Sequence, residues 1–270
     1  MAGFRLGGKA TDVDMTQGSI LSHILKFAFP LLLGNLFQQM YNTVDTFVVG
    51  NYVSSSAFSA VGAVTPIVNM LIGAFSGLAS GAGVVISRQY GAGEPEKVSK
   101  SVHTAVVLTA ILSVVFTVIG LALMPVMLNI LGLNAQDRAE ATTYLSIYFA
   151  GITGLLFYNM GAGILRAVGD SKRPFYYLVV CAVMNTVLDL VFVIVFSMGV
   201  AGVALATILS QFVSALLVCS ALLHTDSSVK VRPRQLRLHK DKLRLMLLFR
   251  LLLFCRKQKV PLRNENSHNL

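Results

Sequence analysis

The chain has 270 residues, of which 55% are hydrophobic and only 13% are charged, and its mean hydropathy is +0.71. Soluble domains carry about 25% charged residues, so this composition excludes a water-soluble globular protein. The formal net charge is +10 at pH 7. The basic residues lie mainly in the stretches before, between and after the apolar segments. This distribution favours a membrane protein over a nucleic-acid-binding one.

Apolar stretches long enough to cross a bilayer occur six times, and each span needs about 20 residues. They predict transmembrane helices over roughly 20–50, 57–87, 101–124, 139–164, 174–197 and 201–224. The predicted fold is therefore all-α and polytopic. It has a cytoplasmic N-terminal segment (1–19), a six-helix lobe (20–224), a basic linker (225–246) and a C-terminal tail (247–270). Gly73, Gly77 and Gly81 recur every four residues and predict a close contact between two helices.

Lysine and arginine residues gather on one side of these segments. Ten of the 22 lie in the first 224 residues, and of these only Arg138 falls in an opposite-side connection. The positive-inside rule then predicts that both ends of the chain are cytoplasmic. We interpret the basic cluster after the sixth segment as a topology signal, with contact to anionic membrane lipid as the alternative.

Two acidic residues, Asp45 and Asp189, lie in the interior of the apolar segments, and the other acidic residue within the stated bounds, Glu140, stands at the very start of the fourth segment. A charge in a membrane-spanning helix costs at least a few kcal/mol, so such residues usually bind ions or relay protons. Counted at helical rise from Lys26 and Arg173, they lie about 28 Å and about 24 Å from the cytoplasmic ends of their helices. Thr207 on the returning sixth segment reaches a similar depth, and this layer is the candidate site.

Polar residues accompany both carboxylates. Tyr41 precedes the first and Asn185 the second by four positions, so each pair shares one helical face. Gln38 and Asn42 extend the first face. An amide or phenol beside a carboxylate can share its proton or complete an oxygen cage for a hard cation such as Na⁺. A structural hydrogen bond between helices is the alternative interpretation.

Pro30 lies inside the first segment, where it removes one backbone hydrogen bond and predicts a bend. This bend is either a moving part of the helix or a static kink, and the sequence favours neither.

Five stretches resemble, in order, parts of the multidrug and toxin extrusion (MATE) family. They read PLLLGNLFQQMYNTVDTFVVG (30–50), RQYGAGEPEKV (88–98), ILRAVGDSKRPF (164–175), MNTVLDLVFV (184–193) and GVAGVALATILSQ (199–211). The resemblance covers residues 15 to about 246 and implies the N-terminal six-helix lobe of a transporter with two such lobes. After residue 246 the pattern departs, and from this we expect a truncation or frameshift.

The resemblance also implies a function in a bacterial or archaeal cytoplasmic membrane. Family members export cationic or amphipathic drugs by antiport, driven by H⁺ or Na⁺. The family's coupling residues match Asp45, Asp189, Asn185, Tyr41 and Thr207, and its bending proline matches Pro30. We assign Gln38 and Asn42 to the substrate cavity, and Asp45, Asp189 and Asn185 to a candidate sodium site. We expect no cofactor apart from the coupling ion.

Three other readings remain open. A related transporter moves lipid-linked saccharides, although the predicted spans hold almost no interior lysine or arginine. An intramembrane aspartyl protease also uses two membrane carboxylates, but its glycine–aspartate signature is absent around Asp189. The third is an inactive or assembly-only half that pairs with itself or with a second lobe. Because the sequence shows no nucleophile–base arrangement, we do not expect an enzyme.

Overall fold

The computed structural model describes residues 20–246, 248 and 249, which form a bundle of long helices. They are α1 (Ile20–Tyr52), α2 (Ser55–Gly91), α3 (Pro95–Ile130), α4 (Ala135–Ala167), α5 (Lys172–Leu190) and α6 (Gly199–His224). A π-helical segment, η1 (Val191–Val195), continues α5, and a 3-10 turn, η2 (Pro233–Gln235), follows α6. The all-α prediction is thereby confirmed. The predicted N-terminal segment 1–19 and the tail from residue 250 lie outside the described residues.

Five of these helices are long and apolar enough to cross a membrane: α2, α3, α4, α6, and α5 taken together with η1. Helix α1 also has the length, with 33 residues. A stripe of polar side chains lies along its second half and consists of Gln38, Gln39, Asn42, Thr43, Asp45 and Thr46. The six predicted segments therefore all form helices, and α1 is the one that differs in composition.

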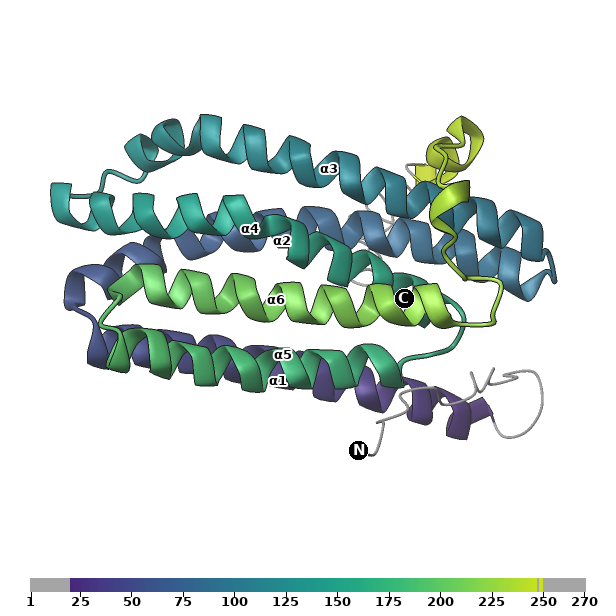
Figure 1. Cartoon of the computed structure of the whole chain (residues 1–270), viewed down its shortest axis with the longest axis horizontal. Coiled ribbons are helices and arrows are strands. Elements are labelled where there is room, and N and C mark those ends of the chain that lie inside the picture. Colours follow the sequence, from purple (N-terminus) through teal and green to yellow (C-terminus); the bar gives the residue numbers. More distant parts are fainter. Residues whose placement is uncertain (1–19, 247, 250–270) are drawn as a thin grey trace, which may run out of the picture.

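Helix α4 is the centre of the bundle, because it packs against α2, α3 and α6. Helix α5 lies between α6 and α1, so α1 and α5 form one edge and α3 forms the opposite one (Figure 1). The largest apolar core lies among α2, α3 and α4 and includes the fully buried side chains of Phe75, Phe149 and Ile152.

Glycines of α4 allow α6 to approach it closely. A Cβ on Gly154 would lie 3.0 Å from the backbone nitrogen of Phe212, and one on Gly161 would lie 2.8 Å from Val218. Around Gly73, in contrast, a Cβ would meet no atom within 4 Å. The predicted close contact is therefore wrong at Gly73, and the close helix pair is α4 with α6, as small residues favour in membrane bundles.

Helices α2 and α4 both start with a side-chain N-cap, and a hydrogen bond joins the two starts. Ser54 accepts a hydrogen bond from the Ala57 amide (3.0 Å) at the start of α2, and Asn134 accepts one from the Asp137 amide (2.8 Å) at the start of α4. Asp137 also accepts a hydrogen bond from the Ser56 hydroxyl at 2.6 Å. The two helix starts are thus tied together at the same end of the bundle.

The linker that follows α6 crosses over α3 and is hydrogen-bonded to it (Figure 1). The Arg232 amide donates to Nε2 of His103 (3.0 Å), and the His239 amide donates to the Thr104 hydroxyl (3.3 Å). Val231 is buried, and its amide donates to the Leu222 carbonyl of α6. The basic linker predicted from the sequence is therefore packed onto the lobe.

Gly154→Val should destabilise the bundle by about 1–3 kcal/mol, because its side chain meets the backbone of α6, which cannot move aside as a flexible side chain can. Gly73→Val makes the same change of residue type in a helix with open space around it. Thermal unfolding of both variants in detergent measures the difference. Equal midpoints for the two variants would contradict the close packing of α4 on α6.

Candidate functional site

The contact between α1 and α5 brings Asp45 and Asp189 together. Asp189 is fully buried, and Asp45 is partly buried. Their carboxyl groups interact with each other. Two residues that are 144 positions apart thus form a carboxyl pair inside the helical bundle.

Three of the four oxygens of this pair are buried without a donor among the described residues. Asp45 Oδ1 and both Oδ atoms of Asp189 have no hydrogen-bond partner among the described residues. Ionised carboxylates are acceptors only, so a hydrogen bond between them requires a proton on one of the two. Burying a carboxylate without a partner is costly. The pair therefore fits a bound proton or a small cation.

Asn185 supplies a third unsatisfied polar group on the same face of α5. It is 1% exposed, and both Oδ1 and Nδ2 are without a partner within the described part of the chain. Its Oδ1 adds a neutral oxygen to the carboxylates, which is a ligand type that hard cations accept. The predicted sodium ligands Asp45, Asp189 and Asn185 thus have the chemistry of an oxygen site.

Helix α5 changes its winding immediately after the site. Asp189 is followed by Leu190 and then by η1, whose hydrogen bond runs from the Phe196 amide to the Val191 carbonyl. The turn into α6 places Ser197 at φ 53°, a left-handed conformation that is costly for a residue other than glycine. Such π-helical turns occur frequently at functional sites.

Aromatic and polar residues of α4 and α6 surround the pair, and the sequence analysis did not single them out. Tyr144 and Tyr148 stack with ring centroids 6.1 Å apart, and Tyr144 interacts electrostatically with both carboxylates. Tyr148 lies against Gln211 of α6. A signal for α6 was present in the sequence, because four polar residues recur there at helical spacing: Thr207, Ser210, Gln211 and Ser214. The Thr207 hydroxyl donates to the Val203 carbonyl of its own helix.

A cavity of about 310 Å³ leads from the loop between α4 and α5 towards the site. Pro30, Gln38 and Tyr41 of α1 line it, together with Tyr158 of α4 and Gln211 of α6. Tyr41 is 9% exposed and lies against Gln38. Asp45 and Asp189 do not line the cavity. The lining residue nearest to Asp45 along α1 is Tyr41, one helical turn away.

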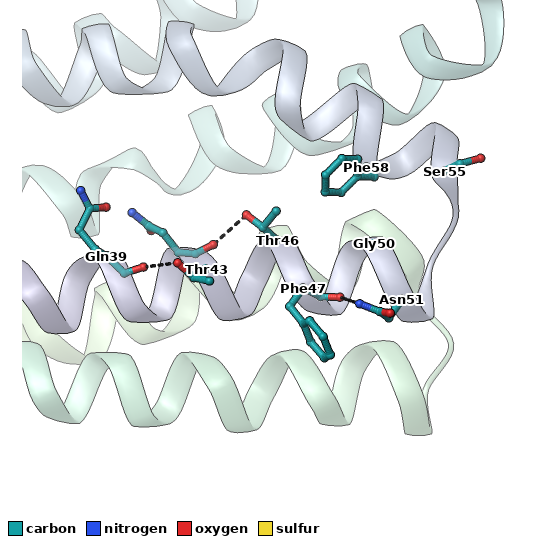
Figure 2. A pocket seen from close by; sticks show the side chains of 9 residues that line it. Gln39, Thr43, Thr46, Phe47, Gly50, Asn51, Ser55 and Phe58 are labelled. Atoms are coloured by element: carbon teal, nitrogen blue, oxygen red, sulfur yellow. Dashed lines mark hydrogen bonds between the residues drawn. The ribbon is translucent and has the colours of Figure 1, made fainter.

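Asn42 faces a different space. It lines a groove of about 660 Å³ between α1 and α2, with Gln39, Thr43 and Thr46 as neighbours on α1 (Figure 2). Figure 2 also shows the Thr43 and Thr46 hydroxyls donating to carbonyls of their own helix. The structure thus separates the two predicted substrate-cavity residues: Gln38 lines the internal cavity and Asn42 lines the outer groove.

An apolar cluster closes the opposite side of the carboxyl pair. It contains Val48 and Val49 of α1, Val193 of η1, and Val200 and Val203 of α6, all 5% exposed or less. These residues lie beyond Asp45 and Asp189 along their helices, towards the turns that join α1 to α2 and η1 to α6. The pair is therefore sealed on this side and reached through polar groups on the other.

Comparisons with known proteins agree with this architecture. A model of the MatE family matches residues 30–191. The probable multidrug resistance protein YpnP of Bacillus subtilis is 35% identical over 198 residues, which are 73% of this chain and 44% of the relative. The probable multidrug resistance protein YoeA of the same organism is 31% identical over 242 residues, which are 86% of this chain and 52% of the relative. A MOP superfamily transporter from Pyrococcus furiosus superimposes with a TM-score of 0.83 at 28% identity, over 91% of this chain and 54% of its own. The chain spans about half the length of these relatives.

Asp189→Asn should leave the fold at pH 8 at least as stable as the unmodified chain, because the amide gives Asp45 a hydrogen-bond donor without a proton having to be shared between two carboxyl groups. Thermal unfolding in detergent at low sodium measures this change. Asp226→Asn is the matched control, since the Asp226 side chain is fully exposed. A lower midpoint for Asp189→Asn than for the control would contradict an unsatisfied carboxyl pair.

Proposed function

Because the chain belongs to the MatE family of multidrug efflux transporters, we propose that it forms a lobe that exports cationic or amphipathic drugs in exchange for H⁺ or Na⁺. The observation that carries this proposal is the carboxyl pair of Asp45 and Asp189, of whose four oxygens three are buried and have no donor among the described residues. Multidrug resistance relatives support the substrate class.

Coupling requires that the ion and the drug favour different states of the lobe. An H⁺ or Na⁺ bound between Asp45 and Asp189 cancels one of their two negative charges, removes the repulsion between them and lets α1 and α5 pack together. Without the ion, two adjacent carboxylates repel each other across that contact. Release of the ion therefore favours a state in which α1 and α5 are rearranged, and a drug that binds this state is exchanged for the ion.

The internal cavity supports a route for the drug and the ion. Its volume of about 310 Å³ is at the lower end of small-molecule sites. Aromatic side chains from three helices, those of Tyr41, Tyr158 and Phe175, offer apolar faces to a flat amphipathic drug, while the charged residue in the lining is Arg166. Tyr41 is also placed to pass a proton between the cavity and Asp45, one turn further along α1.

A second six-helix lobe completes the proposed transporter. The groove between α1 and α2 carries the exposed side-chain amides of Gln39 and Asn42, which lipid tails do not satisfy. We place this groove on the surface that faces a second lobe, which a second copy supplies where this chain is expressed alone. The loop charges support an orientation with both ends in the cytoplasm.

Asp189→Asn should abolish ethidium efflux from pump-deficient bacteria that express the 270-residue chain, because the amide cannot bind or release the coupling proton and weakens a sodium site. Asp226→Asn should retain efflux, since its side chain is exposed and far from the pair in sequence. Fluorescence of loaded cells follows the loss of ethidium. Full efflux by Asp189→Asn, or none by the unmodified chain, would contradict the proposal.

Pro30→Ala should slow efflux more than it changes stability, because Pro30 interrupts the hydrogen bonding of α1 at the internal cavity. Alanine restores one backbone hydrogen bond and stiffens the helix that carries Asp45. Initial efflux rates, normalised to membrane-inserted protein, measure the effect. Pro66→Ala in α2 is the control for replacing a proline inside a helix. Unchanged rates for Pro30→Ala would show that the proline is a static kink.

A further inference from the structure

A second polar cavity lies at the other end of the bundle from the turn into α6, where the linker crosses α3. Its volume is about 530 Å³. The first turns of α3 form one wall and the linker forms the other. The lining residues are Pro95, Glu96, Ser99, Lys100 and His103 from α3 and Ser227, Ser228, Lys230, Arg232, Gln235 and His239 from the linker. No step of the proposed transport uses this cavity.

Positive charge dominates the lining. Lys100, Lys230 and Arg232 are cationic, and Glu96 is the single acidic residue among them. Lys230 also lies 3.8 Å from Asp226, whose side chain is fully exposed to solvent and so screens it weakly. The start of α3 adds to the positive potential, because the N-terminus of a helix carries a partial positive charge. The cavity therefore attracts an anion.

Two hydroxyl groups in the cavity wall point to the kind of anion. Ser227 Oγ and Ser228 Oγ are buried, and neither has a hydrogen-bond partner among the described residues. A hydroxyl can donate one hydrogen bond, and such donors together with lysine and arginine suit the several acceptor oxygens of a phosphate group. Chloride or a carboxylate would leave more of these donors unused.

The walls of the cavity are held in place by a buried histidine. His103 is 2% exposed, its Nδ1 lies 2.7 Å from the Ser99 carbonyl oxygen, and its Nε2 accepts a hydrogen bond from the Arg232 amide. These two bonds require a proton on Nδ1 and none on Nε2. The histidine thereby fixes the linker, and with it the backbone of Arg232, against the first turns of α3.

We propose that this cavity binds a phosphate group, carried by an anionic phospholipid or present as free phosphate. The loop charges place this end of the bundle at the cytoplasmic face, where anionic headgroups are concentrated. Basic pockets between transmembrane helices on this face are suited to such headgroups. A bound headgroup would bridge the linker and α3, and so hold the chain segment after α6 on the lobe.

Binding is tested with the purified 270-residue chain in neutral detergent, by the shift in its thermal midpoint and by native mass spectrometry. The probes are short-chain phosphatidylglycerol, short-chain phosphatidylcholine and inorganic phosphate. The double variant Lys100→Gln/Lys230→Gln removes two charges from the cavity. Lys97→Gln/Arg237→Gln removes two charges from the same segments outside it, since neither residue lines the cavity.

The cavity variant should bind phosphatidylglycerol about 30-fold more weakly than the unmodified chain, at about 1 kcal/mol per lysine, while the control variant should bind within about 3-fold. Ser227→Ala/Ser228→Ala, which leaves the charge unchanged, should also weaken binding and so separates hydrogen bonding from charge. A response to inorganic phosphate as well would identify free phosphate as a ligand, and a response to the lipid alone would identify the headgroup. Equal binding by the cavity and control variants, or no response to either phosphate source, would overturn the proposal.

Discussion

The burial of two carboxyl groups against each other is the constraint on which the rest of this lobe depends. Three of the four carboxyl oxygens of Asp45 and Asp189 are buried and have no donor among the described residues. In a medium of low dielectric constant, such a pair is stable only with a proton or a cation between its oxygens. The contact between α1 and α5 is therefore conditional on an ion, whereas the apolar contacts of α4 with α2, α3 and α6 are not. The lobe thus consists of a permanent core and one edge whose packing depends on its ligand.

Much of this arrangement could be predicted from the sequence, because helical rise converts sequence distance into depth. Counting from the basic residues at the helix ends placed Asp45 and Asp189 in one layer, and the structure brings their side chains together. The sequence did not show which neighbour each face of α1 meets. Gln38 and Asn42 are four residues apart and nearly aligned, yet one lines the internal cavity and the other the groove beside α2. Gln38 and Asn42 differ because each meets a different neighbouring helix, and helix packing alone determines which helix that is.

The same limit explains the errors in helix packing and winding. A four-residue repeat of glycine shows that a close approach is possible, but not that another helix is present; at Gly73 there is none, and the approach occurs at Gly154 and Gly161. The π-helical segment η1 also has no sequence signal, since Val191–Val195 reads as ordinary apolar helix. Two constraints act on its winding. Helix α5 has to bury Asp189, and the chain then has to turn at Ser197 into α6. Tertiary contacts decide both features, and local propensity does not.

The two sides of the carboxyl pair differ in a way that bears on alternating access. Valines of α1, η1 and α6 seal one side, while Tyr41, Gln38 and Gln211 connect the other to a cavity. Under the proposed exchange, an ion that crosses the lobe passes the sealed side, so the valine cluster has to separate at some point. Elements with stored strain or incomplete hydrogen bonding help to hold this cluster: η1, the left-handed Ser197 and the proline-containing α1. Because α1 carries Asp45, and η1 continues the helix α5 that carries Asp189, loss of the proposed ion would weaken the α1–α5 contact and the seal together, and this shared support gives the proposed coupling a physical basis.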